Sequence, residues 1–159
     1  MAGGVRRARA EDAESIGRVH YLAHVETYTG HFPPEVIDGN PPERRARMWN
    51  HIIGEQLGDV WVAEVDGDIV GFASTAPPRD ENPPRDVELA TIYLLAAHQG
   101  SGLGQALLDA ALGDRPASLW VLDENPRAIA FYRRNHFEAD GAEKIDPTYG
   151  NIREIRLVR

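Results

Sequence analysis

The sequence contains no cysteine, which excludes disulfide bonds, thiolate metal sites and a cysteine nucleophile. No apolar run approaches the roughly 18 residues of a membrane-spanning helix, and the basic N-terminus is not followed by the apolar segment of a signal peptide. Basic residues are in the minority, with 17 Lys and Arg against 25 Asp and Glu and a formal net charge of -8. This balance argues against a general affinity for nucleic acid or anionic membranes and favours cationic small molecules or peptides. We therefore expect a soluble cytoplasmic protein.

The length of the chain suits one domain. Its 159 residues, of which 42% are hydrophobic, suffice for a single adequate core. The stretch 76–86 is rich in proline and charge and shows no periodicity, so it is expected to be a loop, although it is too short to link two domains. There is no internal repeat and no low-complexity tract. We expect residues 1–159 to form one domain.

Hydrophobic periodicity predicts an alternation of helices and strands. The first predicted helix starts at Glu11 and Asp12 and ends near Gly30, and further helices are predicted at 42–53, 103–112 and 126–135, with a short turn at 35–38. Strands are predicted at 5–9, 59–65, 68–75, 87–95, 117–122, 137–145 and 152–158. Asp66-Gly67 joins the second and third of these strands and is a strong signal for a two-residue hairpin.

The predicted helix over 42–53 is distinguished by its arginines. It begins at Pro42, a favoured first helical residue, and carries Arg44, Arg45 and Arg47 beside the apolar Met48, Trp49, Ile52 and Ile53. This distribution predicts a solvated basic side opposite a core side. The alternative is that the helix forms a wall of a substrate pocket.

A glycine-rich turn, Gln99-Gly-Ser-Gly-Leu-Gly104, stands between a predicted strand and a predicted helix. Glycine has no Cβ, so the backbone can approach a ligand closely and adopt positive φ, while the amides that open the next helix are unpaired donors. Such a turn can hold a phosphate, although glycine clusters also make ordinary turns. The P-loop and Rossmann spacings both fail, because no Gly-Lys-Ser/Thr follows and Gln105 stands where a third Rossmann glycine is needed.

The order of elements and the spacing of this turn resemble the GNAT superfamily of N-acetyltransferases over almost the whole chain. The family's pyrophosphate loop reads Gln/Arg-x-x-Gly-x-Gly/Ala, as at 99–104, and its second signature, Asn-x-x-Ala-x-x-Phe-Tyr, is matched by Asn125, Ala128, Phe131 and Tyr132. The resemblance implies a mixed α/β fold whose mostly antiparallel central sheet is splayed at the fourth strand and has helices on both faces.

The same resemblance implies acetyl-CoA as the cosubstrate and a primary amine of a small molecule or peptide as the acceptor, with direct transfer in a ternary complex. The residues that would bind CoA are Ile92, Tyr93, Leu94, Gln99, Gly100, Ser101, Gly102, Leu103, Gly104 and Asn125. The first three would pair with the pantetheine arm through their backbone. Asn125 would reach CoA or only cap its helix. Relatives often carry a basic residue at the position of Ser101, so backbone amides and the helix dipole are left to hold the pyrophosphate.

Two residues carry the chemistry that the resemblance implies. An alkyl ammonium has a pKa of about 10 and is no nucleophile at neutral pH, so a base or a water chain must take its proton. Glu88 is the candidate base, on the strand that enters the loop, where many relatives carry a glutamate; the alternative is a half-exposed carboxylate that attracts a cation or pairs with an arginine. Tyr132 matches the tyrosine that relatives use to protonate the departing thiolate, and its alternative is core packing beside Phe131.

The acceptor remains open. In relatives the first helices and their loop form one wall of its site, which points to His24, Tyr28, His31, Phe32, Trp49 and Trp61, each with a core or surface position as the alternative. The histidines and scattered carboxylates form no ligand set such as His-Glu-x-x-His, so no metal is expected. A non-catalytic CoA-binding sensor or interaction module is the alternative function. A homodimer is possible because dimers are common among relatives.

Overall fold

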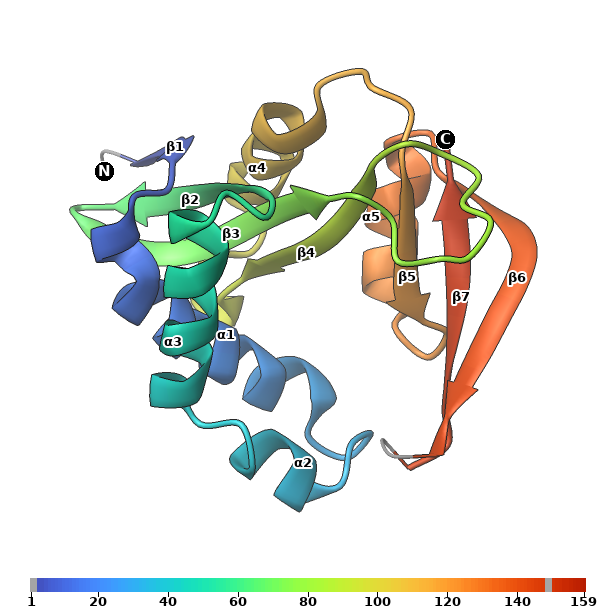
Figure 1. Ribbon diagram of the computed structural model, residues 1–159, viewed down its shortest axis with the longest axis horizontal. Coiled ribbons are helices and arrows are strands. Elements are labelled where there is room, and N and C mark those ends of the chain that lie inside the picture. Colours follow the sequence, from blue (N-terminus) through green and yellow to red (C-terminus); the bar gives the residue numbers. More distant parts are fainter. Residues whose placement is uncertain (1–2, 148–149) are drawn as a thin grey trace.

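The computed structural model describes residues 3–147 and 150–159, and its strands form one seven-stranded sheet in the order β1-β2-β3-β4-β5-β7-β6 (Figure 1). The strands are β1 Gly3–Arg7, β2 Asp59–Val65, β3 Asp68–Ala76, β4 Glu88–Leu94, β5 Ser118–Leu122, β6 Glu138–Asp146 and β7 Ile152–Val158. Neighbouring strands run antiparallel except β4 and β5, which are parallel. The predicted mixed, mostly antiparallel sheet is confirmed.

The helices begin and end close to where periodicity placed them. They are α1 Ala13–Tyr28, preceded by the 3-10 turn η1 Ala10–Asp12, then α2 Pro34–Asp38, α3 Pro42–Gly54, the 3-10 turn η2 Ala96–His98, α4 Leu103–Leu112 and α5 Pro126–Arg134. Residues 35–38 are part of a short helix rather than the predicted turn. The reason is local, since Pro34 fixes a helical φ at the first position and the Gly39 N–H closes the helix on the Glu35 carbonyl at 2.9 Å.

The predicted hairpin joins β2 to β3. Asp66 and Gly67 have φ of 52° and 86°. Both angles lie in the left-handed region that a type I′ turn requires at its two central residues, and that turn matches the twist of the flanking strands. The two residues therefore fix the register of the hairpin, in which Val65 faces Asp68.

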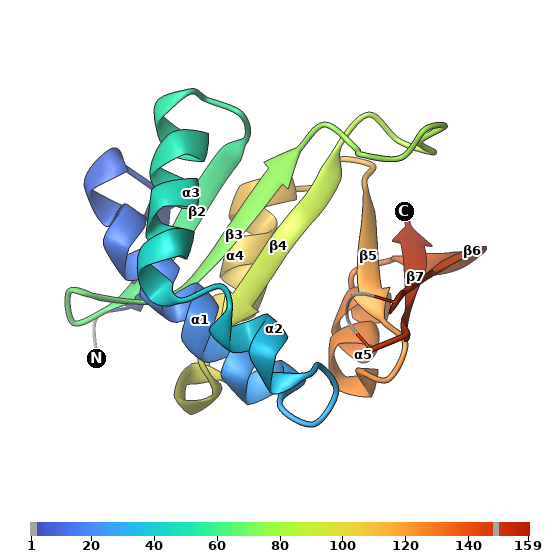
Figure 2. The same cartoon turned by 60° about the horizontal axis from the view of Figure 1, so that its bottom comes forward.

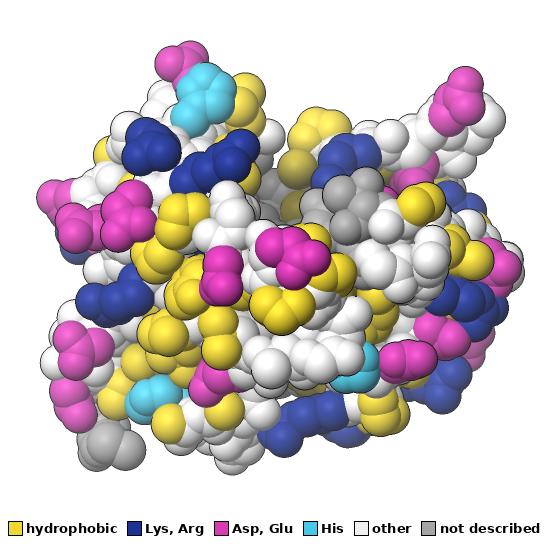
Figure 3. Space-filling model, turned by 90° about the horizontal axis from the view of Figure 1, so that it is seen from below, with side chains coloured by type: hydrophobic (Ala, Val, Ile, Leu, Met, Phe, Trp, Pro, Cys, Tyr) yellow, Lys and Arg dark blue, Asp and Glu magenta, His cyan; other side chains and the backbone are white. Residues whose placement is uncertain are grey.

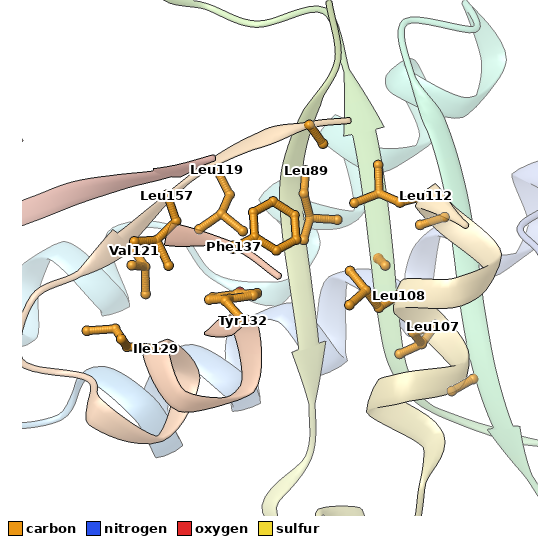
Figure 4. Packing of buried hydrophobic residues seen from close by; sticks show 14 of the residues in the cluster. Leu89, Leu107, Leu108, Leu112, Leu119, Val121, Ile129, Tyr132, Phe137 and Leu157 are labelled. Atoms are coloured by element: carbon orange, nitrogen blue, oxygen red, sulfur yellow. The ribbon is translucent and has the colours of Figure 1, made fainter. Parts of the chain in front are cut away.

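Helices cover both faces of the sheet, as the resemblance implied. On one face α4 and α5 pack against the sheet through a core of buried residues that includes Leu89, Leu107, Leu119 and Phe137 (Figure 4). On the other face α1 and α3 cover β2 and β3, with Ile16, Val19, Trp49, Val62 and Phe72 at the centre of a second cluster. Figure 2 shows α1 and α3 on the near side of β3 and β4 and α4 behind them. Among the described elements, the half of the sheet made by β5, β7 and β6 has a helix, α5, on one face only (Figures 1 and 2).

The contact between α1 and α3 corrects one expectation. The helices approach closely at Gly17, where a Cβ would lie 2.6 Å from the Ala46 backbone nitrogen. Arg45, expected on a solvated basic side, faces this contact and is 2% exposed. The sequence spacing did indicate that Arg45 is buried, because it lies four residues before Trp49 and seven before Ile52, on the apolar stripe of the helix.

Candidate active site

The parallel strands β4 and β5 separate soon after they begin. Within the described residues they pair only where Glu88 faces Ser118, and the Ser118 N–H donates to the Val87 carbonyl at 3.1 Å. Beyond this point β4 continues to Leu94 with β3 on its other edge, so the backbone N–H and C=O groups that face β5 have no strand partner. Figure 2 shows the two strands diverging. We call this region the splay. The segment predicted to pair with a pantetheine arm, 92–94, lies on this open edge.

The glycine turn follows β4 and leads into α4. Gly100 and Gly102 have φ of 80° and 89°, which favours glycine. Gly102 is the N-cap of α4, and its carbonyl accepts the first intrahelical hydrogen bond, from the Ala106 N–H at 3.1 Å. The N–H groups of Gly104 and Gln105 therefore point out of the first turn of the helix. Outward amides at the positive end of a helix dipole suit a phosphate group.

Two side chains hold the turn in place. The Gln99 amide donates to the Leu94 carbonyl at 3.1 Å, which ties the turn to the end of β4. The Ser101 hydroxyl donates to the His98 carbonyl inside the loop. Because that hydroxyl is engaged within the turn, the backbone amides are the donors that remain for an anion.

Three tyrosines from three different elements surround the splay. Tyr132, on α5, is 9% exposed and its ring packs edge-on against Phe137 at 6.0 Å (Figure 4). Burial raises the pKa of Tyr132, and the nearby Tyr28 of α1 raises it further. Burial and the neighbouring Tyr28 and Tyr132 also raise the pKa of Tyr93, on β4. The hydroxyls of Tyr28 and Tyr93 lie 3.4 Å apart. All three phenols therefore keep their protons at neutral pH.

Glu88 lies at the closed end of the splay. It is 2% exposed, and burial raises its pKa, against the opposing charge of Arg79, whose Nε lies 3.6 Å from the Glu88 carboxylate. Among the described residues, the buried atoms Glu88 Oε2, Asp80 Oδ2 and Ser118 Oγ have no hydrogen-bond partner. Ser118 is opposite Glu88 on β5, and Asp80 accepts from the Trp120 indole N–H at 3.1 Å. These three oxygens therefore lack a hydrogen bond to any described residue, although Arg79 lies 3.6 Å from Glu88 Oε2 and Arg156 lies 3.9 Å from Asp80 Oδ2.

A row of hydrogen bonds runs from α3 to the tyrosines. The buried Arg45 guanidinium contacts the Asn40 carbonyl at 2.6 Å and His24 Nδ1 at 2.9 Å. His24 Nε2 lies 3.1 Å from the Tyr93 hydroxyl. Burial and the charge of Arg45 lower the pKa of His24 to about 3, so its imidazole is neutral.

The remaining predicted site residues occupy varied positions. Asn125 caps α5, its side-chain oxygen accepting from the Ala128 N–H at 3.2 Å. Phe32 stacks on Tyr28 with ring centroids 4.4 Å apart, and His31 lies 3.2 Å from Glu124 in the turn before α5.

Two tryptophans lie away from the acceptor wall. Trp49 is 2% exposed, and its indole N–H donates to the buried His20 at 3.1 Å, so it lies in the core behind α1. Trp61 packs with the core under α4, on the opposite face of the sheet, and its ring lies under the guanidinium of Arg7. We leave both out of the acceptor site.

Sequence reasoning missed Arg79, Asp80 and Ser118 around Glu88. The first two belong to the loop before β4, where no periodicity indicates which side chains turn inward. A single serine at the start of a predicted strand carries no signal either. The pairing of β5 with β4 brings Ser118 beside Glu88, and the loop before β4 folds back so that Arg79 and Asp80 act on the same carboxylate.

The described part of the chain contains no group of three or more His, Asp or Glu side chains that could hold a metal ion. No helix within residues 3–147 and 150–159 is both long and apolar enough to cross a membrane.

The model of the acetyltransferase (GNAT) family matches residues 22–137. YuaI, an uncharacterized N-acetyltransferase of Bacillus subtilis (strain 168), is 30% identical over 160 residues, which cover 96% of this chain and 90% of that protein. An uncharacterized N-acetyltransferase of Archaeoglobus fulgidus is 28% identical over 143 residues, which cover 80% of this chain and 88% of that protein.

Solved structures share the fold. The PaiA N-acetyltransferase of Thermoplasma acidophilum in complex with coenzyme A has a TM-score of 0.68 at 19% identity and is matched over 100% of both chains. An N-acetyltransferase from Staphylococcus aureus Mu50 has a TM-score of 0.73 at 19% identity, over 100% of this chain and 98% of that chain. At these identities the likeness concerns the fold alone.

Proposed function

Since this chain belongs to the acetyltransferase (GNAT) family, we propose that it transfers the acetyl group of acetyl-CoA directly to a primary amine of a small molecule or peptide. The observation that carries the proposal is the open edge of β4, which leads straight into the glycine turn. An extended pantetheine arm can pair with the open edge of β4, and a pyrophosphate can bind at the glycine turn. CoA is a ligand that carries both parts in one molecule.

The donor site would use mostly backbone groups. Ile92, Tyr93 and Leu94 would pair with the pantetheine arm, and the outward amides of the glycine turn and of the first turn of α4, Gly104 and Gln105 among them, with the pyrophosphate. A Cβ at Gly104 would meet only Leu94 Cδ2, at 4.0 Å, so the protein leaves the space over the first turn open. The acetyl carbonyl would be polarised by backbone amides of the same strand edge, which stabilises the oxyanion of the tetrahedral intermediate.

Tyr132 is the proposed general acid. Its hydroxyl is protonated at neutral pH because burial raises its pKa. When the carbon–sulfur bond of the intermediate breaks, the Tyr132 O–H bond would break as the S–H bond of CoA forms. Its ring packs against Phe137, and Tyr28 is close enough to raise its pKa, which supports a hydroxyl beside the splay, where the sulfur would depart.

Glu88 is the proposed general base, acting through water. At about 3.3 Å per residue, about 13 Å of strand separates it from Ile92, too far for its side chain to reach an amine at that level directly. Glu88 Oε2, Asp80 Oδ2 and Ser118 Oγ have no hydrogen bond within the part of the protein that the structure describes. They suit a bound water, which needs two to four polar partners. Burial raises the pKa of Glu88 toward that of an effective base at neutral pH.

The acceptor would enter from the face that carries α1. His24, Tyr28, His31 and Phe32 form the proposed wall, and Glu154 of β7 is close enough for its charge to raise the pKa of Tyr28. On the side of the molecule seen from below, acidic and basic side chains are interspersed (Figure 3). The carboxylates at Glu88 and Glu154 favour an ammonium group over an anion at the site itself.

Thermal shift and thiol release test the proposal together. Acetyl-CoA should raise the melting temperature, and a panel of polyamines, amino acids, aminoglycosides and peptides should reveal an amine that releases CoA thiol in step with product. No stabilisation by acetyl-CoA contradicts the donor site. Stabilisation without thiol release for any amine favours the non-catalytic CoA-binding alternative. Propionyl-CoA and succinyl-CoA, run beside acetyl-CoA, define the acyl preference.

A further inference from the structure

The arginine that lies buried between α1 and α3 determines the protonation of its neighbour. Arginine only donates hydrogen bonds, so the contact of Arg45 Nη1 with His24 Nδ1 at 2.9 Å requires that Nδ1 accept. A neutral imidazole with a bare Nδ1 carries its hydrogen on Nε2. That hydrogen points at the Tyr93 hydroxyl, 3.1 Å away.

The protonation of His24 also sets the direction of the hydrogen bond between the Tyr93 and Tyr28 hydroxyls. Because the Tyr93 oxygen accepts from His24 Nε2–H, its own hydrogen must be directed elsewhere. The hydroxyl of Tyr28 lies 3.4 Å away and is the neighbour on the side of the splay. The rings of His24 and Tyr28 meet edge-on at 5.0 Å, and those of His24 and Tyr93 at 5.2 Å, so neither hydroxyl is free to move far.

We propose that Arg45 and His24 are positioning residues that hold the Tyr93 hydroxyl as a donor to Tyr28, which directs the hydrogen of Tyr28 toward the splay. The role in catalysis rests on the proposed function. Because Tyr28 accepts from Tyr93, the hydrogen of Tyr28 is left as the donor that stabilises negative charge as it develops on the departing sulfur, or on Tyr132 once that residue has given up its proton. A donor that is oriented before the reaction begins costs no reorganisation when the charge appears.

The surroundings of His24 support one fixed tautomer. The titratable and charged groups that face its ring are His20 and Tyr28 of α1, Arg45 of α3 and Tyr93 of β4. Arg45 is the cation among them, because burial lowers the pKa of His20 to about 2 and that ring is neutral. The charge of Arg45 therefore acts against protonation of His24 at any pH where the protein functions.

Long-range proton–nitrogen NMR of the imidazole rings tests this arrangement without any assay of activity. His24 should be the Nε2–H tautomer, with Nδ1 unprotonated, from pH 5 to pH 8. Its signals are assigned by their loss in His24→Gln, which separates them from those of His20, whose Nδ1 accepts from Trp49. An Nδ1–H tautomer, or protonation of the ring within that range, overturns the proposal whether or not acetyl transfer is found.

Two substitutions at His24 then test the catalytic role. Glutamine carries its amide near the position of Nε2 and retains a donor to Tyr93, whereas the shorter asparagine retains an acceptor for Arg45 but does not reach Tyr93. We expect His24→Asn to lower kcat by up to about 100-fold with the KM of acetyl-CoA unchanged, and His24→Gln to restore most of the loss. Arg18→Gln, an exposed change on the same helix, is the control for unspecific effects of charge.

A double-mutant cycle with Tyr93→Phe completes the test. If His24 acts through the Tyr93 hydroxyl, His24→Asn should add little to the loss in kcat once that hydroxyl is gone. Equal losses for His24→Asn and His24→Gln, or full additivity with Tyr93→Phe, would show that His24 only packs against its neighbours. In that case the positioning role fails while acetyl transfer itself stands.

Discussion

Gly104 offers a substitution that separates binding of acetyl-CoA from folding. It is the second residue of α4, its φ is not in the left-handed region, and a Cβ there would touch only Leu94 Cδ2, at 4.0 Å. A larger residue therefore fits the protein alone. Alanine in place of glycine gains at most about 1 kcal/mol of helix stability, which raises Tm by about 2–4 °C in a chain of this size. Valine gains a few tenths of a kcal/mol, because its branched side chain loses rotamers in a helix.

The two variants should differ in binding. The family's loop pattern accepts Gly or Ala at this position, so Gly104→Ala should bind acetyl-CoA like the wild type. The two methyl groups of Gly104→Val project over the amides of the first turn and keep a phosphate from reaching them. Loss of one charge-assisted hydrogen bond costs about 1.5–3 kcal/mol, which corresponds to a rise in Kd of about 10- to 150-fold.

Titration calorimetry with acetyl-CoA and thermal unfolding without it measure the two effects separately. We expect both variants to unfold at or above the wild-type temperature and only Gly104→Val to lose affinity. Unchanged affinity in a folded Gly104→Val protein would refute the assignment of the pyrophosphate to this turn. If Gly104→Val lost affinity for acetyl-CoA and an equal free energy of unfolding, the interpretation that the space around Gly104 is open would be refuted.

Three further changes give distinct outcomes. Tyr132→Phe should lower kcat by about 10²- to 10⁴-fold with the KM of acetyl-CoA unchanged, in steady-state thiol release; an unchanged kcat excludes the acid role. Glu88→Gln should lower kcat. It should also become more stable than the wild type as pH rises above about 4.5, because burial raises the folded-state pKa of Glu88 and the wild type then charges a buried carboxylate. Urea unfolding at pH 4 and pH 8 shows whether the difference in free energy of unfolding between variant and wild type grows with pH. Gly17→Ala should destabilise by about 1–3 kcal/mol, since its Cβ would lie 2.6 Å from the Ala46 nitrogen, whereas Gly54→Ala, with open space around it, should not.

The elements of the fold were accessible from the sequence because their signals are local. The bounds predicted for α4, 103–112, are those observed, since Gly102 and Gly113 mark both of its ends. The hairpin at Asp66-Gly67 needed only two residues with positive φ. The short helix α2 was missed because five residues are too few for periodicity to distinguish a helix from a turn.

Residues of the candidate site could be predicted from the sequence only where they belong to a motif. The glycine turn stood out by its spacing, and the match to a family motif led to Tyr132. Spacing could not show that Trp49 is part of the core, because a helical tryptophan has the same signature on a core face and on a pocket wall. The loop residues around Glu88 had no local signal at all, because their positions depend on the contact of Arg79 with Glu88 of β4 and of Asp80 with Trp120 of β5.

By itself, the sequence determined the family, the order of the elements and the turn suited to a pyrophosphate, because periodicity, caps and spacing depend on residues close together in the chain. The tertiary structure decided which edge of β4 is open and which polar side chains are buried. It also joined Arg45 of α3 to His24 of α1 and through it to Tyr93 of β4. Those contacts link residues 21 and 69 positions apart, and only the packing of α1 and α3 on the sheet brings them within hydrogen-bonding distance.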